Sequence, residues 1–128
     1  MGTLERLWIG LAAALGAIAV LAGAFAAHAL SDPRAVELFR TGAQWQAVHV
    51  LACLLAVILG HLGLTAARAA GPVFLAGAVL FSGSLYALAL GAPIWTAAFT
   101  PIGGLLFIAG WVIVGWSAIF RSGTKGRA

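Results

Sequence analysis

The chain has 128 residues, of which 63% are hydrophobic and only 8% carry a formal charge. A soluble domain has about 25% charged residues, so this chain has too few to cover a surface that faces water. Its mean hydropathy of +1.10 indicates that much of its surface faces lipid. The net charge of +4 comes from few and dispersed basic residues, which favours a role in membrane orientation over nucleic-acid binding.

Four apolar segments are long enough to cross a bilayer, since about 20 helical residues span its hydrocarbon core of about 30 Å. They cover residues 7–30, 43–64, 72–91 and 101–120. Pro72 and Pro101 stand where the first turn of a helix tolerates a missing N–H, and Thr100 is an N-cap candidate. We therefore predict one all-α membrane domain, 1–128, whose four transmembrane helices form an up-down bundle.

A polar stretch separates the first two segments. Ser31-Asp32-Pro33 is typical of an N-cap followed by a helix start, and Gly42 is a suitable end. Val36 and Phe39 share one face of this stretch, with charged residues mostly on the other. The pattern predicts a short interfacial helix between the first and second membrane helices; an irregular polar loop is the alternative.

Basic residues are distributed unevenly between the two sides of such a bundle. The side of the termini and the middle connection holds five of them: Arg6, Arg68, Arg121, Lys125 and Arg127. The other side holds Arg34 and Arg40. Because cytoplasmic loops carry an excess of Lys and Arg, this split predicts a plasma-membrane protein, in a bacterial inner membrane, with both termini in the cytoplasm.

Tryptophans support this orientation, because they concentrate at membrane interfaces. Trp8 and Trp116 fall near the inner interface, and Trp45 and Trp95 fall near the outer one. Trp111 falls near the middle of the membrane. We expect Trp111 to pack against another helix or to face lipid.

Small residues recur at four-residue spacing in the first and third segments. They are Ala19, Gly23 and Ala27, and Gly83, Ala87 and Gly91. Small residues let membrane helices approach closely. We therefore expect Gly23, Gly83 and Ala87 to face another helix, either within the bundle or in a second copy of the chain.

Four motifs in chain order resemble a known family. They are Gly23-Ala-Phe-Ala-Ala-His-Ala-Leu30, Gln46-Ala-Val-His49, Leu80-Phe-Ser-Gly-Ser-Leu-Tyr86 and the stretch from Thr100 to Trp111. Together they are similar to domain of unknown function 423, whose animal relatives are called transmembrane protein 256. The chain departs from the family pattern at Ala26, where Gly is usual, and at Trp45, where Tyr is usual. The resemblance implies a small multi-pass membrane protein and no established activity.

Polar side chains within the segments are candidates for a site, because polar groups in a membrane are costly. The predicted topology places six of them at similar depth near the outer surface: His28, Gln46, His49, Ser82, Tyr86 and Thr100. We call these residues the outer patch. His61, about 18 Å along the axis from His49, belongs to the inner end and is expected to be an ordinary interfacial histidine.

Three interpretations of the outer patch remain open. His49 and Cys53 are four residues apart and share a helix face, so that with His28 they form a candidate metal site. An imidazole near its usual pKa also suits a site for protons or a small solute. The third interpretation is an interhelical hydrogen-bond network that fixes the bundle, with no metal and no cofactor.

The sequence argues against an enzyme. It has no phosphate-binding loop or dinucleotide fingerprint in a strand–helix context. Its only acids are Glu5, Asp32 and Glu37, all outside the predicted spans, so a Ser-His-Asp set is excluded. The absence of a membrane-buried glutamate also argues against the mechanism of small proton-coupled multidrug exporters.

Two functions fit these observations. The first is a non-enzymatic accessory or interaction protein that contacts the bilayer and other membrane proteins or itself. The alternative is a small transporter, channel, or ligand or metal binder that works through the outer patch. A water-accessible cavity that reaches His49 favours the alternative, and a dry, closely packed centre favours the accessory role.

The orientation is directly testable. A reporter that fluoresces only in the cytoplasm, fused after Ala128, is expected to be bright, because the basic residues hold both termini on that side. The matching fusion is a phosphatase that is active only in the periplasm. High phosphatase activity at this position would overturn the assignment.

Overall fold

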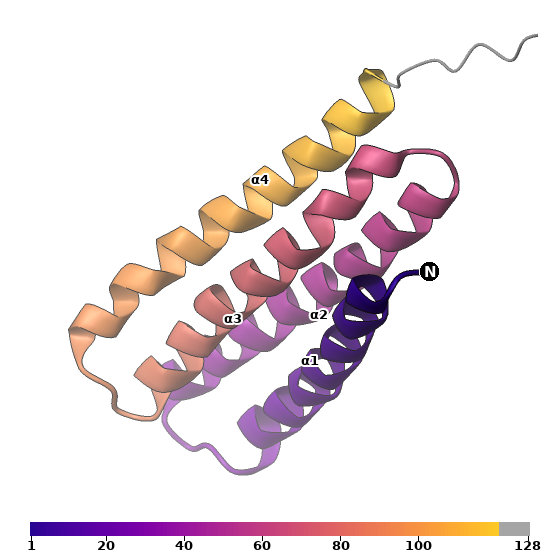
Figure 1. The fold of residues 1–128 in the computed structure, drawn as a ribbon. Helices are drawn as coiled ribbons and strands as arrows, with labels where there is room; N and C mark the ends of the chain where they lie inside the picture. The colour runs from indigo at the N-terminus through magenta and orange to yellow at the C-terminus, as the bar shows by residue number, and fades with distance from the viewer. Residues whose placement is uncertain (121–128) are drawn as a thin grey trace, which may run out of the picture.

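A computed structural model describes residues 1–120 and consists of four long antiparallel helices (Figure 1). These are α1 (Thr3–His28), α2 (Pro33–His61), α3 (Ala70–Ala89) and α4 (Phe99–Ile119). The short 3-10 helices η1 (Thr65–Ala69) and η2 (Ile94–Ala98) lead into α3 and α4. All four are long and apolar enough to cross a membrane, which confirms the predicted all-helical membrane bundle. Three of the basic residues used for orientation, Arg121, Lys125 and Arg127, lie outside the described residues.

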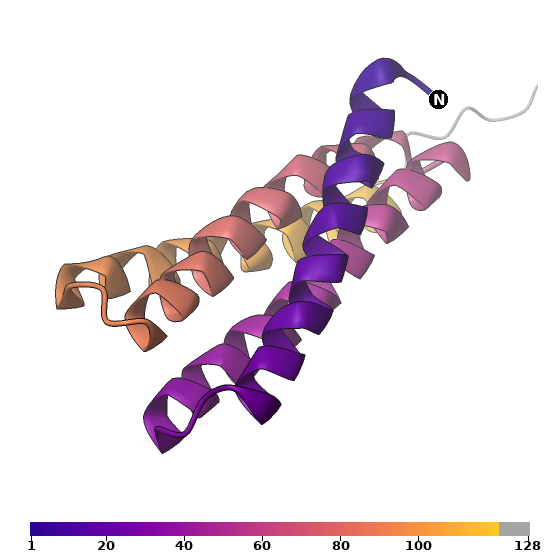
Figure 2. The ribbon, with the colours of Figure 1, turned by 90° about the horizontal axis from the view of Figure 1, so that it is seen from below.

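The helices pack in chain order, α1 on α2, α2 on α3 and α3 on α4. In Figure 1, α1 and α4 lie at opposite edges, and the start of the chain lies at the same end as the end of α4. Figure 2 shows the same ribbon from below, with α1 crossing α2 at an angle. Half of the most apolar stretch of α2 is buried, compared with 22% for α1 and for α4. The two edge helices therefore present most of their surface to lipid.

The predicted interfacial helix is wrong, because residues 33–42 are the first turns of α2. The helix does begin as expected, with the Asp32 side chain accepting a hydrogen bond from the Ala35 N–H at 3.2 Å. It continues through Gly42 because this stretch is packed on its neighbours. The ring of Phe39 lies 4.8 Å from that of Tyr86 on α3, and Gly42 packs under the same tyrosine ring.

The continuity of α2 changes the depth of everything after it. A helix of 29 residues is about 43 Å long, which exceeds the hydrocarbon core of about 30 Å. Its first turns, which carry Arg34 and Arg40, therefore extend toward the membrane surface. Gln46 and His49 then fall near the middle of the helix rather than near its outer end.

Glycines on α3 and α4 receive phenylalanine rings from the opposite helix. Gly77 lies under the ring of Phe107, and Gly110 lies under the ring of Phe74. At Gly103, an added Cβ would lie 2.7 Å from the Cβ of Phe81 and would also collide with the backbone there. These three pairs contribute to the contact between α3 and α4, where phenylalanine atoms fill the space that the glycines leave.

The small residues predicted to face another helix mostly do not do so in the described chain. Gly83 is exposed, and a Cβ added at Gly83 or at Gly23 would meet nothing within 4 Å. Ala87 is half-buried. The four-residue spacing correctly identified a face of α3 that carries small residues. The buried face of α3, however, is the one that carries Gly77 and Ser84.

A matched pair of glycine substitutions tests this packing. We expect Gly103→Ala to lower the free energy of unfolding by about 1–3 kcal/mol, because the added methyl meets backbone that cannot move aside. We expect Gly83→Ala not to lower it, because that position is open and alanine is favoured over glycine in a helix by up to about 1 kcal/mol. Unfolding in mixed micelles measures both. A larger loss at Gly83 than at Gly103 would contradict the arrangement of α3 and α4.

Candidate functional site

A hydrogen-bonded polar layer joins the first three helices, and we define it as Gln46, Ser82 and Tyr86. The amide of Gln46 donates to the carbonyl oxygen of Leu15 on α1 at 2.6 Å. Its oxygen accepts the Tyr86 hydroxyl of α3 at 2.7 Å. The Ser82 hydroxyl donates to the carbonyl oxygen of Gly42 at 2.7 Å. Gln46 is only 2% exposed and Ser82 is fully buried, so these bonds replace water that the membrane interior lacks.

Gln46 lies near the middle of α2, which corrects its predicted depth. Gln46 follows Pro33 by 13 residues, or about 20 Å of helix. His28 follows Leu15 by the same number of residues on α1, so it lies about 20 Å from the carbonyl that Gln46 binds. His28 is exposed at the end of α1. The prediction that His28 joins the other members of the outer patch is therefore wrong.

His49 is held through both ring nitrogens. Nδ1 lies 2.8 Å from the carbonyl oxygen of Trp45, which can only accept a hydrogen bond, so Nδ1 carries the proton. Nε2 lies 3.1 Å from the indole nitrogen of Trp111, which can only donate. These two partners assign one neutral tautomer to His49. Both ring nitrogens of His49 are occupied, and the residue is only 1% exposed. His49 is therefore not available to an ion or a substrate.

An aromatic cluster from three helices encloses His49. Its ring stacks on Phe107 of α4, with ring centroids 3.5 Å apart. The ring of Trp45 of α2 lies nearly parallel to it with centroids 5.8 Å apart, and the ring of Phe74 of α3 is tilted against it at 5.7 Å. Trp111 was expected only to pack or to face lipid, and its hydrogen bond was missed. An indole N–H in the middle of the membrane needs a hydrogen-bond acceptor. This requirement was the feature of the sequence that could have predicted a polar partner for Trp111.

Thr100 lies at the end of the bundle opposite the start of the chain and is not the N-cap of α4. The helix begins one residue earlier, at Phe99, directly after η2. The hydroxyl of Ser84 on α3 donates to the carbonyl oxygen of Phe81 at 2.8 Å. Since Ser84 has one hydroxyl proton, the 2.6 Å contact between Ser84 and Thr100 is a hydrogen bond that Thr100 donates. This pair joins α3 to α4.

A groove of about 490 Å³ opens toward lipid beside the aromatic cluster, between α2 and α4. We call it the α2–α4 groove. Its lining residues are Trp45, His49, Phe81, Pro101, Gly104, Leu105, Phe107, Ile108 and Trp111. Its walls are apolar, since the His49 nitrogens are already bonded. The groove therefore offers packing surface and no free acid, base or metal ligand.

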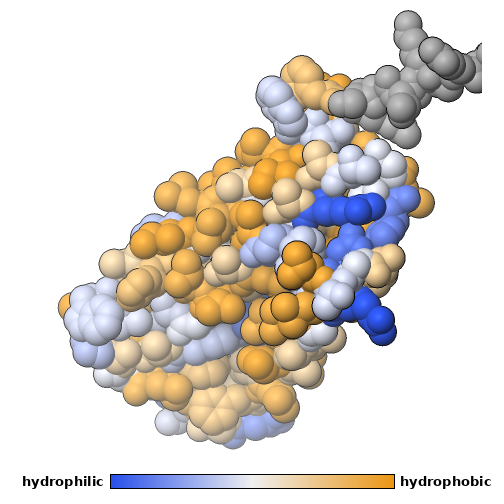
Figure 3. All heavy atoms as spheres, in the orientation of Figure 1, coloured by the Kyte–Doolittle hydropathy of each residue, from blue (hydrophilic) through white to orange (hydrophobic). Residues whose placement is uncertain are grey.

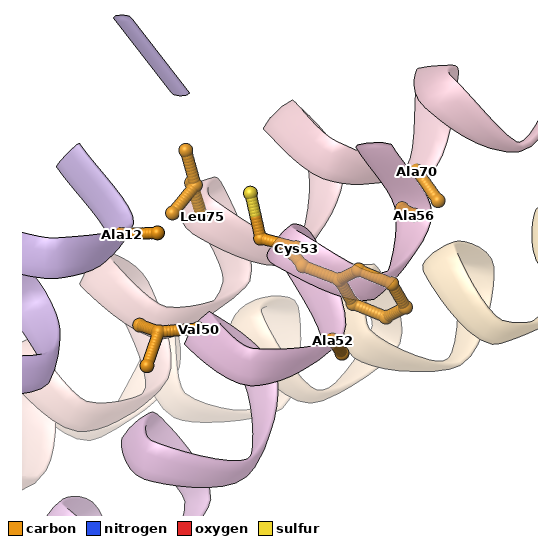
Figure 4. Packing of buried hydrophobic residues seen from close by; sticks show 8 residues of the cluster. Ala12, Val50, Ala52, Cys53, Ala56, Ala70 and Leu75 are labelled. Atoms are coloured by element: carbon orange, nitrogen blue, oxygen red, sulfur yellow. The ribbon is translucent and has the colours of Figure 1, made fainter. Parts of the chain in front are cut away.

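Cys53 belongs to the apolar core rather than to a metal site. Figure 4 shows its thiol among Ala12, Val50 and Leu75, where α1, α2 and α3 meet. Within residues 1–120, no group of three His, Cys, Asp or Glu side chains is placed to hold a metal ion. The distance to His28 and the occupied nitrogens of His49 give the geometric reason.

An ionic cluster at the opposite end of the bundle was not foreseen. Oε2 of Glu5 accepts the backbone N–H of Gly2 at 3.0 Å and lies 3.1 Å from Nε2 of His61. Its Oε1 forms an ion pair with Nε of Arg68 at 3.2 Å. Arg68 also donates to the carbonyl oxygen of Gly60 at 3.2 Å. The cluster fastens the start of α1 to the end of α2 and to η1, and His61 takes part in it.

Comparison with known proteins agrees with this architecture. The family described as "Protein of unknown function (DUF423)" matches residues 22–104. The chain belongs to this family. It is 43% identical to the UPF0382 inner membrane protein YgdD of Escherichia coli K12 over 127 residues, which cover 94% of this chain and 97% of the relative. The match confirms the predicted family and a multi-pass protein of the inner membrane.

Other relatives show the same full-length agreement. A UPF0382 membrane protein of Haemophilus influenzae is 37% identical over 93% of this chain and 98% of its own length. The UPF0382 membrane protein YwdK of Bacillus subtilis is 34% identical over 89% of this chain and 97% of its own. No solved structure matches the chain significantly.

The bond between Trp111 and His49 makes a measurable contribution to stability. We expect Trp111→Phe, which keeps an aromatic ring but removes the N–H, to lower the free energy of unfolding by about 0.6–1.7 kcal/mol. Trp116→Phe is the control, because Trp116 is exposed near the end of the same helix. Unfolding in mixed micelles again measures both. Equal losses in the two variants would show that the hydrogen bond contributes nothing.

Proposed function

We propose that this protein is a non-enzymatic accessory or interaction protein of the inner membrane. The observation that carries the proposal is that its buried intramembrane polar side chains have hydrogen-bond partners within the bundle. Gln46, His49 and Tyr86 each have internal partners. A general acid, base or nucleophile needs a free group within reach of a substrate, and the polar layer offers none.

The buried polar atoms that lack a hydrogen-bond partner also support a non-enzymatic role. Within residues 1–120, only two buried side-chain nitrogen or oxygen atoms lack a hydrogen-bond partner, Oε1 of Glu5 and Nε of Arg68. They lie 3.2 Å from each other and form the ion pair of the ionic cluster. What remains for function is therefore the outer surface of the bundle, above all the exposed faces of α1 and α4.

We propose that both termini face the cytoplasm. Arg6 and Arg68 are at the end of the bundle where the chain starts, and Arg34 and Arg40 are at the opposite end. The basic residues after α4 add to the first end in sequence. This distribution supports the orientation through the excess of basic residues in cytoplasmic loops.

A second function, binding of an apolar ligand, is favoured by one observation. The α2–α4 groove has a volume of about 490 Å³, which is within the range of about 300–1,000 Å³ typical of ligand pockets. Gly104 lines it, and a Cβ there would be in ordinary contact with Phe81 at 3.9 Å. Gly104→Leu therefore fills the groove. Gly115→Leu is the matched control, because Gly115 lies in open space on the same helix.

Photo-crosslinking in intact cells separates the two functions. A photoreactive residue at Val20 of α1 or at Val112 of α4, both exposed, is expected to capture a discrete membrane protein. The same group at Val50, which is buried, is expected to capture none. If the exposed positions yield only lipid, and an apolar compound co-purifies with the Gly115→Leu variant but not with Gly104→Leu, the ligand-binding function replaces the accessory one.

A further inference from the structure

A second groove, of about 400 Å³, lies between α1 and α2 at the end that carries the ionic cluster. We call it the α1–α2 groove. Leu54, Ile58 and Leu62 line it along one face of α2, and Ile9 lines it from α1. From Leu54 to Leu62 the face extends for about 12 Å. His61 lines the same groove, so an apolar channel ends at the membrane surface in a polar side chain.

The exposed side chains at this end of the bundle carry a net positive charge. The side chains of His61 and Arg68 are each 38% exposed, whereas that of Glu5, which they share, is only 9% exposed. The anion is thus covered and the basic groups face outward. Arg6 is also exposed. The two positive charges of Arg6 and Arg68 therefore exceed the one negative charge of Glu5 even when His61 is neutral. Figure 3 shows hydrophilic side chains gathered at this end of an otherwise hydrophobic surface.

We propose that the α1–α2 groove binds an anionic phospholipid. One acyl chain lies along Ile9, Leu54 and Ile58, and the phosphate meets the outward side of His61 and Arg68. The occupant is a lipid rather than a soluble phosphate, because an apolar channel between membrane helices leads into the basic end. The proposal is separate from the accessory function, since it concerns the α1–α2 groove and not the exposed positions Val20 and Val112 used for crosslinking.

Charge is expected to decide which lipid is bound. An acyl chain in the groove and one in the bilayer have similar apolar surroundings, so the chain alone gives little preference. Each basic residue near the membrane surface attracts an anionic headgroup with an effect of about fivefold in affinity. A preference of about fivefold for an anionic over a zwitterionic headgroup is therefore the expected minimum, and salt is expected to reduce it.

Spin-labelled lipids in reconstituted vesicles test the proposal. The full chain is placed in phosphatidylcholine vesicles with a trace of spin-labelled phosphatidylglycerol or phosphatidylcholine, and electron paramagnetic resonance measures the motionally restricted fraction. We expect the phosphatidylglycerol label to associate about fivefold more strongly. We expect that preference to fall when the salt concentration rises from about 0.1 M to about 1 M, as the Debye length shrinks from about 10 Å to about 3 Å.

Groove-filling variants locate the site. Ile58→Trp and Leu62→Trp, both at exposed positions, are expected to remove the preference. Ile102→Trp is the matched control, because Ile102 is similarly exposed on α4 and does not line the groove. Two variants are used so that misfolding of one, detected by circular dichroism, leaves the test intact.

Three results would overturn the proposal. The first is equal association of the two lipids with the unmodified chain. The second is a preference that survives in a folded groove-filling variant. The third is displacement of the lipid label by soluble glycerol phosphate, which would indicate a phosphate site without a lipid. None of these results depends on whether photo-crosslinking finds a partner protein, so the two proposals succeed or fail separately.

Discussion

The amide of Gln46 is the interaction on which the arrangement of the first three helices depends. The amide donates a hydrogen bond to a carbonyl of α1 and accepts one from Tyr86 of α3, and Gln46 itself is buried at the centre of α2. No water is available at this depth, so an unpaired amide would carry a penalty of several kcal/mol. Burial of apolar surface gives little preference for one helix register over another, because lipid is equally apolar. The glutamine gives such a preference, because sliding either neighbour by one turn removes a bond.

The fourth helix is positioned by different means. It is joined to α2 through the Trp111–His49 bond and to α3 through the pairing of phenylalanines with glycines. Both depend on α2 and α3 already being in register, since Phe107 stacks on His49 and Trp45 of α2 while Trp111 packs against Phe74 of α3. The position of α4 therefore depends on the packing of α2 and α3, and α2 is also the most buried of the four helices.

Hydropathy and helix signals predicted much of this fold, and the errors have a common cause. Four apolar segments and the Asp32 cap follow from residue chemistry along the chain. Depth and direction around each helix depend on neighbours, which hydropathy does not contain. The charged first turns of α2 looked like a separate helix, so Gln46 and His49 were placed too near the surface. The face of Gly83 was chosen by spacing, although Phe107 of α4 buries the face that carries Gly77.

The distribution of satisfied and exposed groups limits where a function can reside. Polar side chains at mid-bundle are occupied in holding helices together, and the single buried carboxylate is paired with Arg68 and His61. In this structure these groups already have partners, and the proposed accessory function leaves those bonds unchanged. Recognition requires only shape and charge at a surface. The two grooves supply shape, one between α2 and α4 and one between α1 and α2, and only the second combines it with charge. The proposed functions therefore place recognition on the surface that faces lipid, and they assign the buried polar groups to holding the helices together.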